Sequence, residues 1–244
     1  MKSRIFAQRN LKEIFRDPVS LIFSFGLPVA IIILAGVLNQ KIPSGAVNTF
    51  SPELFVPAGA VFAFSFITMF TGMLVSKDRT SNFLTRLFAS PLKPHDYILG
   101  YALPIIPLAL LQSVLCFAIG LIFGLKLTVG VIYSIIALLP CAVFFTAFGL
   151  LFGSILGDKS IGGVSSVLVQ CTALLSGMWF DLELFGKVFE VIMNFLPFAN
   201  FVEVARLSYA GDLLGALPHF LWSVGYAIIT FIFAVFVFKA KSKK

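Results

Sequence analysis

Six stretches of this chain, each at least 21 residues long, contain no Asp, Glu, Lys or Arg. A helix that crosses the hydrocarbon core of a bilayer needs about 20 mostly apolar residues, so each stretch is long enough for one crossing and too short for two. The sequence therefore predicts an all-α membrane protein with six transmembrane helices. The predicted spans are 18–40, 54–76, 97–125, 127–157, 160–180 and 213–238.

The overall composition agrees with a membrane as the main solvent. Hydrophobic residues make up 59% of the 244 positions and charged residues only 12%, against about 25% charged in an average soluble domain. At a mean hydropathy of +1.02, a water-soluble fold would need a polar surface that so few charged side chains cannot supply. The net charge of +7 is typical of loops in membrane proteins and does not indicate a nucleic-acid partner.

Lysine and arginine are distributed unevenly between the segments that join the predicted spans. An even number of spans places both termini on one side of the membrane. That side comprises residues 1–17, the loop 77–96, Lys159 and the tail after 238, and it holds 14 of the 18 basic residues. Because loops rich in Lys and Arg stay in the cytoplasm, the sequence predicts a multi-pass protein of the cell membrane with both termini cytoplasmic.

Residues 1–17 are predicted to form an amphipathic helix at the membrane surface. Arg9, Lys12 and Arg16 lie together on one face of the helical pattern. The apolar face consists of residues spaced i, i+4, i+7 and i+8, namely Ala7, Leu11, Ile14 and Phe15. This pattern is typical of an interfacial helix, although a charged flank that only orients the first span would also fit. Asp17-Pro18 ends the predicted helix where the first span begins.

The loop 77–96 contains a second short amphipathic helix, which Pro91 ends. Its apolar face consists of Phe83, Leu84, Leu87 and Phe88, and its polar face of Arg79, Asn82 and Arg86. A helix of this kind, set between two spans, either lies on lipid or is bound by a soluble partner protein. The pattern alone favours neither interpretation.

The segment 181–212, between the fifth and last predicted spans, is predicted to re-enter the membrane from the outer side. Its uncharged stretch 191–202 is 12 residues long and contains two Asn and one Pro, so it is too short for a crossing.

Glycines and polar residues inside the spans suggest where helices pack. Gly149, Gly153 and Gly157 recur every four residues, as do Gly120 and Gly124, and this spacing permits close helix approach. Polar side chains at membrane depth should face protein or a water-filled cavity. The candidates for a substrate pathway are Thr68, Thr71, Gln112, Gln170 and Thr172. Ordinary hydrogen bonding between helices is the alternative interpretation of these five residues.

Several kinds of chemistry are missing from the sequence. Spans without charged residues argue against an ion-coupled carrier or channel, and the lack of a His-Glu-x-x-His motif or a carboxylate pair argues against an intramembrane enzyme. The three cysteines, Cys116, Cys141 and Cys171, have no metal-ligand spacing and are interpreted as packing residues. No G-x-x-x-x-G-K-[ST] phosphate loop is present, so any uphill transport needs energy from another subunit.

Three stretches together resemble the membrane permease subunits of type-2 ATP-binding cassette (ABC) transporters, many of which are exporters. They are RNLKEIFRDPVSLIFSFGLPVAI, FLTRLFASPLKPHDYILGY and LLSGMWFDLELFGKVFEVIMNFLPFANFVEVARLSYAG. The resemblance covers the whole chain as a single permease domain, 1–244. It implies that residues 1–17 are a connecting helix, that 77–96 is a cytoplasmic coupling loop and that 181–212 is an extracellular re-entrant segment. The family often has Gly-Thr-Leu-Glu before the Arg-Leu pair, whereas this chain has Ser81-Asn82-Phe83-Leu84-Thr85.

The same resemblance implies a function for the chain and for its coupling loop. Phe83, Leu84, Arg86, Leu87 and Phe88 would dock on a separate ABC ATPase subunit, which would use ATP and Mg, while this chain binds no cofactor and is not itself an enzyme. A second permease copy or a homologue would complete the pathway. The expected cargo is an amphipathic drug, antibiotic, peptide or lipid-linked molecule. An ion-coupled carrier or channel, or an intramembrane enzyme, remains the alternative.

Overall fold

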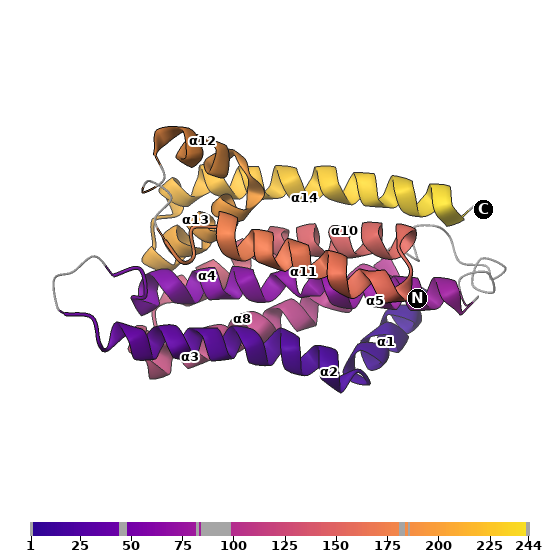
Figure 1. Ribbon diagram of the computed structural model, residues 1–244, viewed down its shortest axis with the longest axis horizontal. Helices are drawn as coiled ribbons and strands as arrows, with labels where there is room; N and C mark the ends of the chain where they lie inside the picture. Colours follow the sequence, from indigo (N-terminus) through magenta and orange to yellow (C-terminus); the bar gives the residue numbers. More distant parts are fainter. Residues whose placement is uncertain are drawn as a thin grey trace.

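The computed structural model describes residues 2–43, 48–81, 83, 99–180, 184 and 186–242. In these parts of the chain the regular structure is entirely helical, which confirms the predicted all-α fold. Most of the helices lie side by side along the long axis of the molecule, with both termini at one end (Figure 1). We refer to that end as the termini end.

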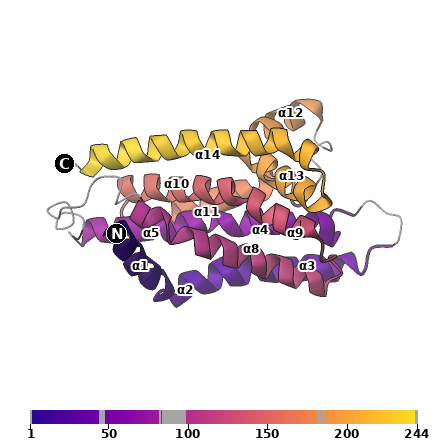
Figure 2. The ribbon, with the colours of Figure 1, turned by 180° about the vertical axis from the view of Figure 1, so that it is seen from behind.

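The helices follow one another with few long connections. In chain order they are α1 (Lys2–Phe15), α2 (Pro18–Leu21), a π-helical turn η1 (Ile22–Gly26), α3 (Leu27–Asn39), α4 (Pro52–Ser65), α5 (Ile67–Thr80), α8 (Ile105–Ile122), α9 (Val129–Ala137), α10 (Leu139–Ile155), α11 (Asp158–Leu175), α12 (Lys187–Phe195), α13 (Pro197–Ala210) and α14 (Leu213–Ser242). We call the end of the bundle where α12 and α13 lie the turn end (Figure 2).

Five helices in the described part of the chain are long and apolar enough to cross a membrane. They are Pro18–Asn39, Pro52–Thr80, Leu99–Ile122, Val129–Ile155 and Leu213–Ala240. These five correspond to the predicted spans other than 160–180. That span corresponds to α11, whose first turn carries Asp158 and Lys159 and is therefore less apolar. Helix α11 runs along the bundle beside α5 (Figure 1). Its crossing of the membrane stays a prediction.

Helices α12 and α13 form a pair that is bent by 84°. The bend lies at Leu196, whose extended backbone separates the two helices, and Pro197 begins α13. A pair bent this sharply is either a broken span or a re-entrant segment, and the sequence predicts the second.

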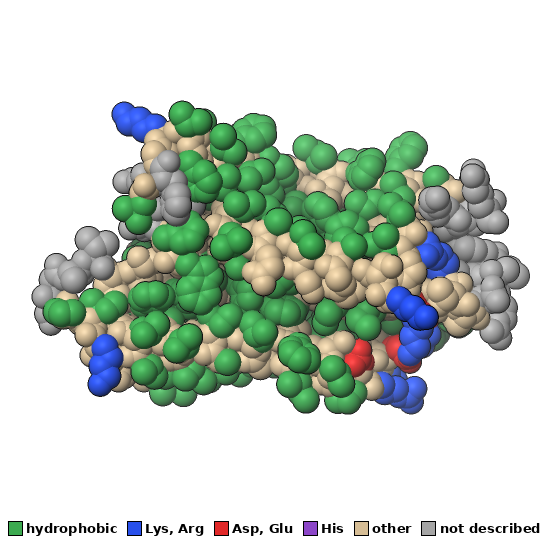
Figure 3. All heavy atoms as spheres, in the orientation of Figure 1, with side chains coloured by type: hydrophobic (Ala, Val, Ile, Leu, Met, Phe, Trp, Pro, Cys, Tyr) green, Lys and Arg blue, Asp and Glu red, His purple; other side chains and the backbone are tan. Residues whose placement is uncertain are grey.

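The second span, α4 followed by α5, forms the centre of the bundle. In its most apolar window 89% of the residues are buried, compared with 28% in the first span and 17% in the last. The outer helices expose many large apolar side chains instead (Figure 3), and charged side chains gather at the two ends. Such a surface is suited to hydrocarbon and not to water.

The first span contains the π-helical turn η1, and the second span is interrupted between α4 and α5. The side chain of Gln112 contacts both irregular positions. Pro28 has no N–H group, so the carbonyl of Ser24, four residues earlier, lacks its usual helical donor. Gln112 Nε2 donates to Ser24 O over 3.4 Å and to Ala63 O over 3.2 Å, beside the break between α4 and α5. Gln112 thus joins the two irregular positions through one amide group.

Helices α5 and α10 approach each other closely along a seam of small residues. A Cβ atom at Gly149 would lie 2.7 Å from Thr68 O, and one at Gly153 would lie 2.6 Å from Gly72 O, so only glycine fits at both positions. The predicted close approach is confirmed for these two glycines and for Gly120, which packs against Val56. It is wrong for Gly157 and Gly124, which lie at helix ends. A Cβ atom added at either position would have no heavy atom of another segment within 4 Å.

Candidate functional site

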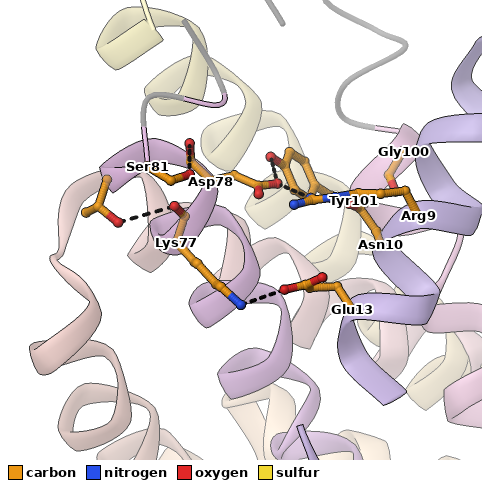
Figure 4. A network of polar contacts seen from close by, with 9 residues as sticks. Arg9, Asn10, Glu13, Lys77, Asp78, Ser81, Gly100 and Tyr101 are labelled. Atoms are coloured by element: carbon orange, nitrogen blue, oxygen red, sulfur yellow. Dashed lines mark hydrogen bonds and ion pairs between the residues drawn. The ribbon is translucent and has the colours of Figure 1, made fainter. Parts of the chain in front are cut away.

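A cluster of polar residues connects α1, α5 and the beginning of the third span at the termini end (Figure 4). Asp78, in the last turn of α5, has only 1% of its surface exposed. Its Oδ2 atom lies 2.7 Å from Arg9 Nη1 and accepts a hydrogen bond of 2.9 Å from the Tyr101 hydroxyl. We call Arg9, Asn10, Asp78, Gly100 and Tyr101 the polar clamp.

Asn10 completes the polar clamp from the buried face of α1. Its Nδ2 donates to Gly100 O over 2.9 Å, and its Oδ1 accepts from Arg9 Nη1 over 2.9 Å. Partial burial opposes the charge on Arg9, but the hydrogen bond and negative charge of Asp78 outweigh burial and raise the pKa of Arg9 above its usual value. The guanidinium therefore stays charged beside the Asp78 carboxyl group.

Aromatic rings pack against the polar clamp. Phe6 contacts the Tyr101 ring edge to face, with centroids 5.0 Å apart, and stacks on Phe83 with centroids 6.3 Å apart. The Arg9 guanidinium lies 4.5 Å from the centre of the Phe83 ring, a cation–π contact. Tyr101 also contacts Phe238, so the last helix joins the same cluster. A side chain at Gly100 would overlap Phe6, so this packing requires glycine.

The polar clamp holds together the two ends of the segment that contains the predicted coupling residues. Asp78 precedes this segment, Tyr101 follows it, and α1 contacts both. Any displacement of the segment's ends would therefore move α1, α5 and the third span together. Of the predicted docking residues, Phe83 is half-buried against Phe6 and Arg9. The other four, Leu84, Arg86, Leu87 and Phe88, lie outside the described residues, and their role stays a prediction.

Sequence reasoning missed the polar clamp because it grouped Arg9 with the outward basic residues of α1. That placement is wrong, since the buried Asp78 carboxylate needs a countercharge and Arg9 provides it. The predicted apolar face is also partly wrong, because Ala7 and Ile14 are buried whereas Phe15 is 53% exposed. The available signal was Asn10. It is a polar residue on the apolar face of the helix, and such a residue indicates a hydrogen-bonding partner in another segment.

The last turn of α5 also contacts the junction between α10 and α11. Arg79 donates to the carbonyls of Ser154 and Leu156, the second over 2.6 Å, and Thr80 Oγ1 donates to Asp158 over 3.0 Å. On the other side, Lys77 Nζ lies 2.5 Å from Glu13 Oε1. That hydrogen bond and the positive charge of Lys77 lower the pKa of Glu13 below its ordinary value of 4.5.

Four of the predicted pathway residues are buried between helices. Thr68 Oγ1 donates to Phe145 O over 3.0 Å, Thr172 Oγ1 donates to Leu168 O over 2.9 Å, and Gln112 bonds as described above. Thr71 is buried against α10, and its hydroxyl has no partner among the described residues. Thr68 and Gln112 thus bond between helices, whereas the bond of Thr172 lies within α11. A pathway role for these residues stays a prediction. The fifth residue, Gln170, is exposed and lines a groove.

The groove lies between the first span, the central helices α4 and α5, and α11, and has a volume of about 590 Å³. Most of its wall is apolar, with Phe62, Phe66 and Met69 on the central helices. Its polar lining consists of Ser20, Ser165, Ser166 and Gln170. Ser165 is 1% exposed, and its hydroxyl has no hydrogen-bond partner in the described part of the chain. Ser165 could not be singled out from the sequence, because a serine in a span resembles any packing serine.

At the turn end, side chains satisfy the carbonyls that the bend between α12 and α13 leaves free. Asn200 Nδ2 donates to Asn194 O over 2.7 Å and to Leu196 O over 2.9 Å, and the Tyr226 hydroxyl donates to Phe195 O over 2.6 Å. Since Asn200 Oδ1 accepts, His219 Nδ1, 2.8 Å away, must be the protonated ring nitrogen.

Arg206 also braces the turn end. Its guanidinium group contacts Leu54 O, Gly177 O and Glu203 Oε1, each at 3.0 or 3.1 Å. These contacts join α13 to the beginning of α4 and to the chain after α11. A single arginine in the sequence carries no sign of this bracing role.

Nothing in the described residues resembles a metal centre, because no three His, Cys, Asp or Glu side chains gather there. Cys116 and Cys141 are buried among apolar neighbours.

A family model described as ABC-2 type transporter matches residues 2–209. The matched range includes the polar clamp, the groove and both helices of the bent pair. No curated protein matches the chain.

Proposed function

The chain belongs to the ABC-2 type transporter family, and from this premise we propose that it drives export of an amphipathic molecule out of the cytoplasm together with a separate ATPase. The matched domain is the membrane component of an ABC transporter and not its ATPase, so the chain is a multi-pass permease subunit. We further propose that it lies in the cell membrane with both termini in the cytoplasm.

The polar clamp is the observation that carries this proposal. It ties the segment between Asp78 and Tyr101 to α1 and α5, and through Tyr101 to α14. A loop that receives force from a soluble partner needs such a rigid connection to the spans, because a flexible one would absorb the movement. We propose that residues Phe83 to Ser90, within this segment of the chain, contact the ATPase.

The groove supports an amphipathic cargo. Its volume of about 590 Å³ lies within the range of about 300–1,000 Å³ that is usual for small-molecule sites. An apolar wall with three serines and one glutamine suits a molecule with an apolar body and a few hydrogen-bonding groups, such as a drug, an antibiotic, a hydrophobic peptide or a lipid-linked molecule. A second copy of the chain, or a homologue, would cover its open side.

The mechanism that follows is alternating access driven from the termini end. ATP binding would close the partner ATPase subunits, which use ATP and Mg, and the coupling loops would move with them. Because the polar clamp fixes Asp78 to α1, this movement would reach the first and second spans together. Both spans line the groove.

The proposal is tested by nucleotide binding. The chain purified alone should neither bind nor hydrolyse ATP, because its sequence contains no phosphate loop. Turnover should appear only after the partner ATPase is added. Stoichiometric ATP binding by the isolated chain, with contaminating ATPases excluded, would contradict the requirement for a partner.

The orientation is tested by labelling single cysteines in intact cells with a reagent that does not cross the membrane. Lys41 and Lys187, both exposed, should react after replacement by cysteine. Lys159, exposed at the termini end, should react only after the cells are opened. The reverse pattern would place the termini end outside the cell and exclude an ATPase contact there.

A further inference from the structure

Helix α1 does not continue the first span but lies at an angle to it across the termini end (Figure 1). The turn between them is fixed by Asp17, which accepts hydrogen bonds from Ser20 N over 3.1 Å and from Ser20 Oγ over 2.6 Å. Because α1 is held by this turn and by the polar clamp, one of its faces is directed away from the bundle.

The two faces of α1 differ in composition. The inward face consists of Phe6, Ala7, Asn10 and Ile14, all of which are buried. The outward face consists of Arg4, Ile5, Gln8, Lys12, Phe15 and Arg16, all of which are exposed. At about 100° per residue, these six outward positions fall within an arc of about 120° on the opposite side of the helix. We call them the outer face of α1.

The outer face of α1 is basic and partly apolar. Arg4, Lys12 and Arg16 form no ion pair with any described residue, whereas Arg9 and Lys77 nearby do. Ile5 is 66% exposed and Phe15 is 53% exposed. No acidic residue lies on this arc, although Arg16 at its end also lies near Glu13, which pairs with Lys77.

We propose that the outer face of α1 binds anionic phospholipid headgroups, and that this contact holds the polar clamp in place. The next residues of the chain favour lipid over an acidic protein surface as the occupant. Ile22, on the adjoining first span, is 68% exposed and does not line the groove. The surface continues from there to the exposed Phe15 and then to three cations without ion pairs. This order of apolar and basic side chains matches the boundary between acyl chains and negative headgroups.

The consequence concerns Arg9 and Asn10, which lie on the same helix as the three outward cations. Headgroups that restrain the outer face of α1 also restrain Arg9 against Asp78 and Asn10 against Gly100. The charge of the surrounding lipid therefore sets how firmly the ends of the coupling segment are tied to the bundle.

Hydrogen exchange of the isolated full-length chain in vesicles tests this proposal without the ATPase or a substrate. One vesicle preparation contains phosphatidylcholine alone, and the other contains about one-third phosphatidylglycerol. Amide exchange in α1 should slow in the anionic vesicles by about fivefold for each basic side chain engaged. Exchange at residues 76–81 and 99–103 should slow with it. About 0.5 M NaCl should remove most of the difference, because salt screens exposed charges.

Matched variants assign the effect to the outer face. The variant R4Q/K12Q/R16Q should lose the dependence on anionic lipid, whereas K41Q/K187Q, which removes exposed lysines at the turn end, should keep it. The variant R4K/R16K retains the charges and should behave as the wild type, even if the glutamine variant fails to fold. Equal exchange of wild-type α1 in both vesicles, or an undiminished lipid effect in a folded R4Q/K12Q/R16Q, would overturn the proposal. Neither result depends on whether the chain exports anything.

Discussion

At the termini end, fully charged side chains join separate helices, as in the pairs Arg9 with Asp78 and Lys77 with Glu13. At the turn end, the polar contacts lie around a single bend. Asn200 and Tyr226 donate to backbone carbonyls, and His219 hydrogen-bonds to Asn200. Arg206 is the charged residue there that reaches other helices, and two of its three acceptors are backbone carbonyls.

The difference between the two ends indicates different mechanical roles. Side chains that satisfy free carbonyls hold a broken helix in one shape, because every alternative shape leaves polar groups unpaired in the membrane. Ion pairs between separate helices fix their relative positions and can pass a displacement from one helix to the next. We therefore expect the turn end to keep its shape and the termini end to transmit movement.

The largest expected effect is at Asp78. Asp78→Ala leaves Arg9 and the Tyr101 hydroxyl without their shared acceptor and should cost about 2–3 kcal/mol of stability. The cost stays below that of a fully buried pair because the Arg9 side chain is 35% exposed. Thermal unfolding of the purified chain measures it. Asp78→Asn keeps an oxygen acceptor and should lose less. An unchanged unfolding temperature for Asp78→Ala would contradict a structural role for the polar clamp.

The next effect distinguishes donors from acceptors at the turn end. Asn200→Ala removes two hydrogen bonds to backbone carbonyls and should cost about 1–3 kcal/mol. Asn200→Asp keeps the size of the side chain but cannot donate to Asn194 O and Leu196 O, so it should be no more stable than the alanine variant. Denaturant unfolding compares the three proteins. Wild-type stability in Asn200→Asp would mean that the bend does not depend on these donors.

Arg206→Lys should have a smaller effect, about 1 kcal/mol. A lysine ammonium cannot reach Leu54 O, Gly177 O and Glu203 at the same time, because it lacks the planar fork of the guanidinium. The chain after α11 should then open more often. A cysteine introduced at Ser176, which is 4% exposed, should react with a thiol reagent faster in Arg206→Lys than in the Ser176→Cys protein alone. Equal rates would remove Arg206 as a brace.

The smallest effect is the pH dependence of the pair between Glu13 and Lys77. Because the pKa of Glu13 is lowered from 4.5 in the folded protein, its stabilisation is fully present above that value and is lost as the pH falls through the lower folded-state pKa. Lys77 is 63% exposed, so the pair contributes about 0.2–1 kcal/mol. Wild type should exceed Glu13→Gln in stability at about pH 6, and this excess should shrink progressively as the pH falls below 4.5. A difference that does not change with pH would assign the stability to packing.

Features set by the bilayer or by the backbone could be predicted from the sequence. The uncharged stretches predicted six spans, and five of them correspond to helices long and apolar enough to cross a membrane, because membrane thickness fixes the length of an apolar helix. Gly149 and Gly153 were predictable because a missing side chain in mid-helix leaves room for a neighbour. Gly157 and Gly124 follow the same spacing but end helices, and the spacing does not record where a helix ends.

Features set by partners far along the chain could not be predicted. Arg9 and Asp78 are 69 residues apart, and a helical pattern around Arg9 contains no information about the carboxylate that it meets. Gln112 was recognised as polar at membrane depth, but its acceptors are carbonyls at irregular positions in two other spans. Ser165 and Arg206 were not distinguished from other serines and arginines, because their significance arises from the groove and from the three elements that meet at α13.

The most direct test of the account is recovery of the ATPase with the double variant Leu87→Asp and Phe88→Asp. If the helix predicted around Leu87 docks on the ATPase, the two aspartates should bury unpaired charges at the contact. This should cost several kcal/mol of binding free energy and abolish co-purification. Membrane abundance should stay normal. The matched control places the same change at the turn end, in Val188→Asp with Val191→Asp, whose side chains are exposed on α12. The account predicts wild-type ATPase recovery for the control and none for the docking variant. Wild-type recovery and wild-type export with Leu87→Asp and Phe88→Asp would contradict it.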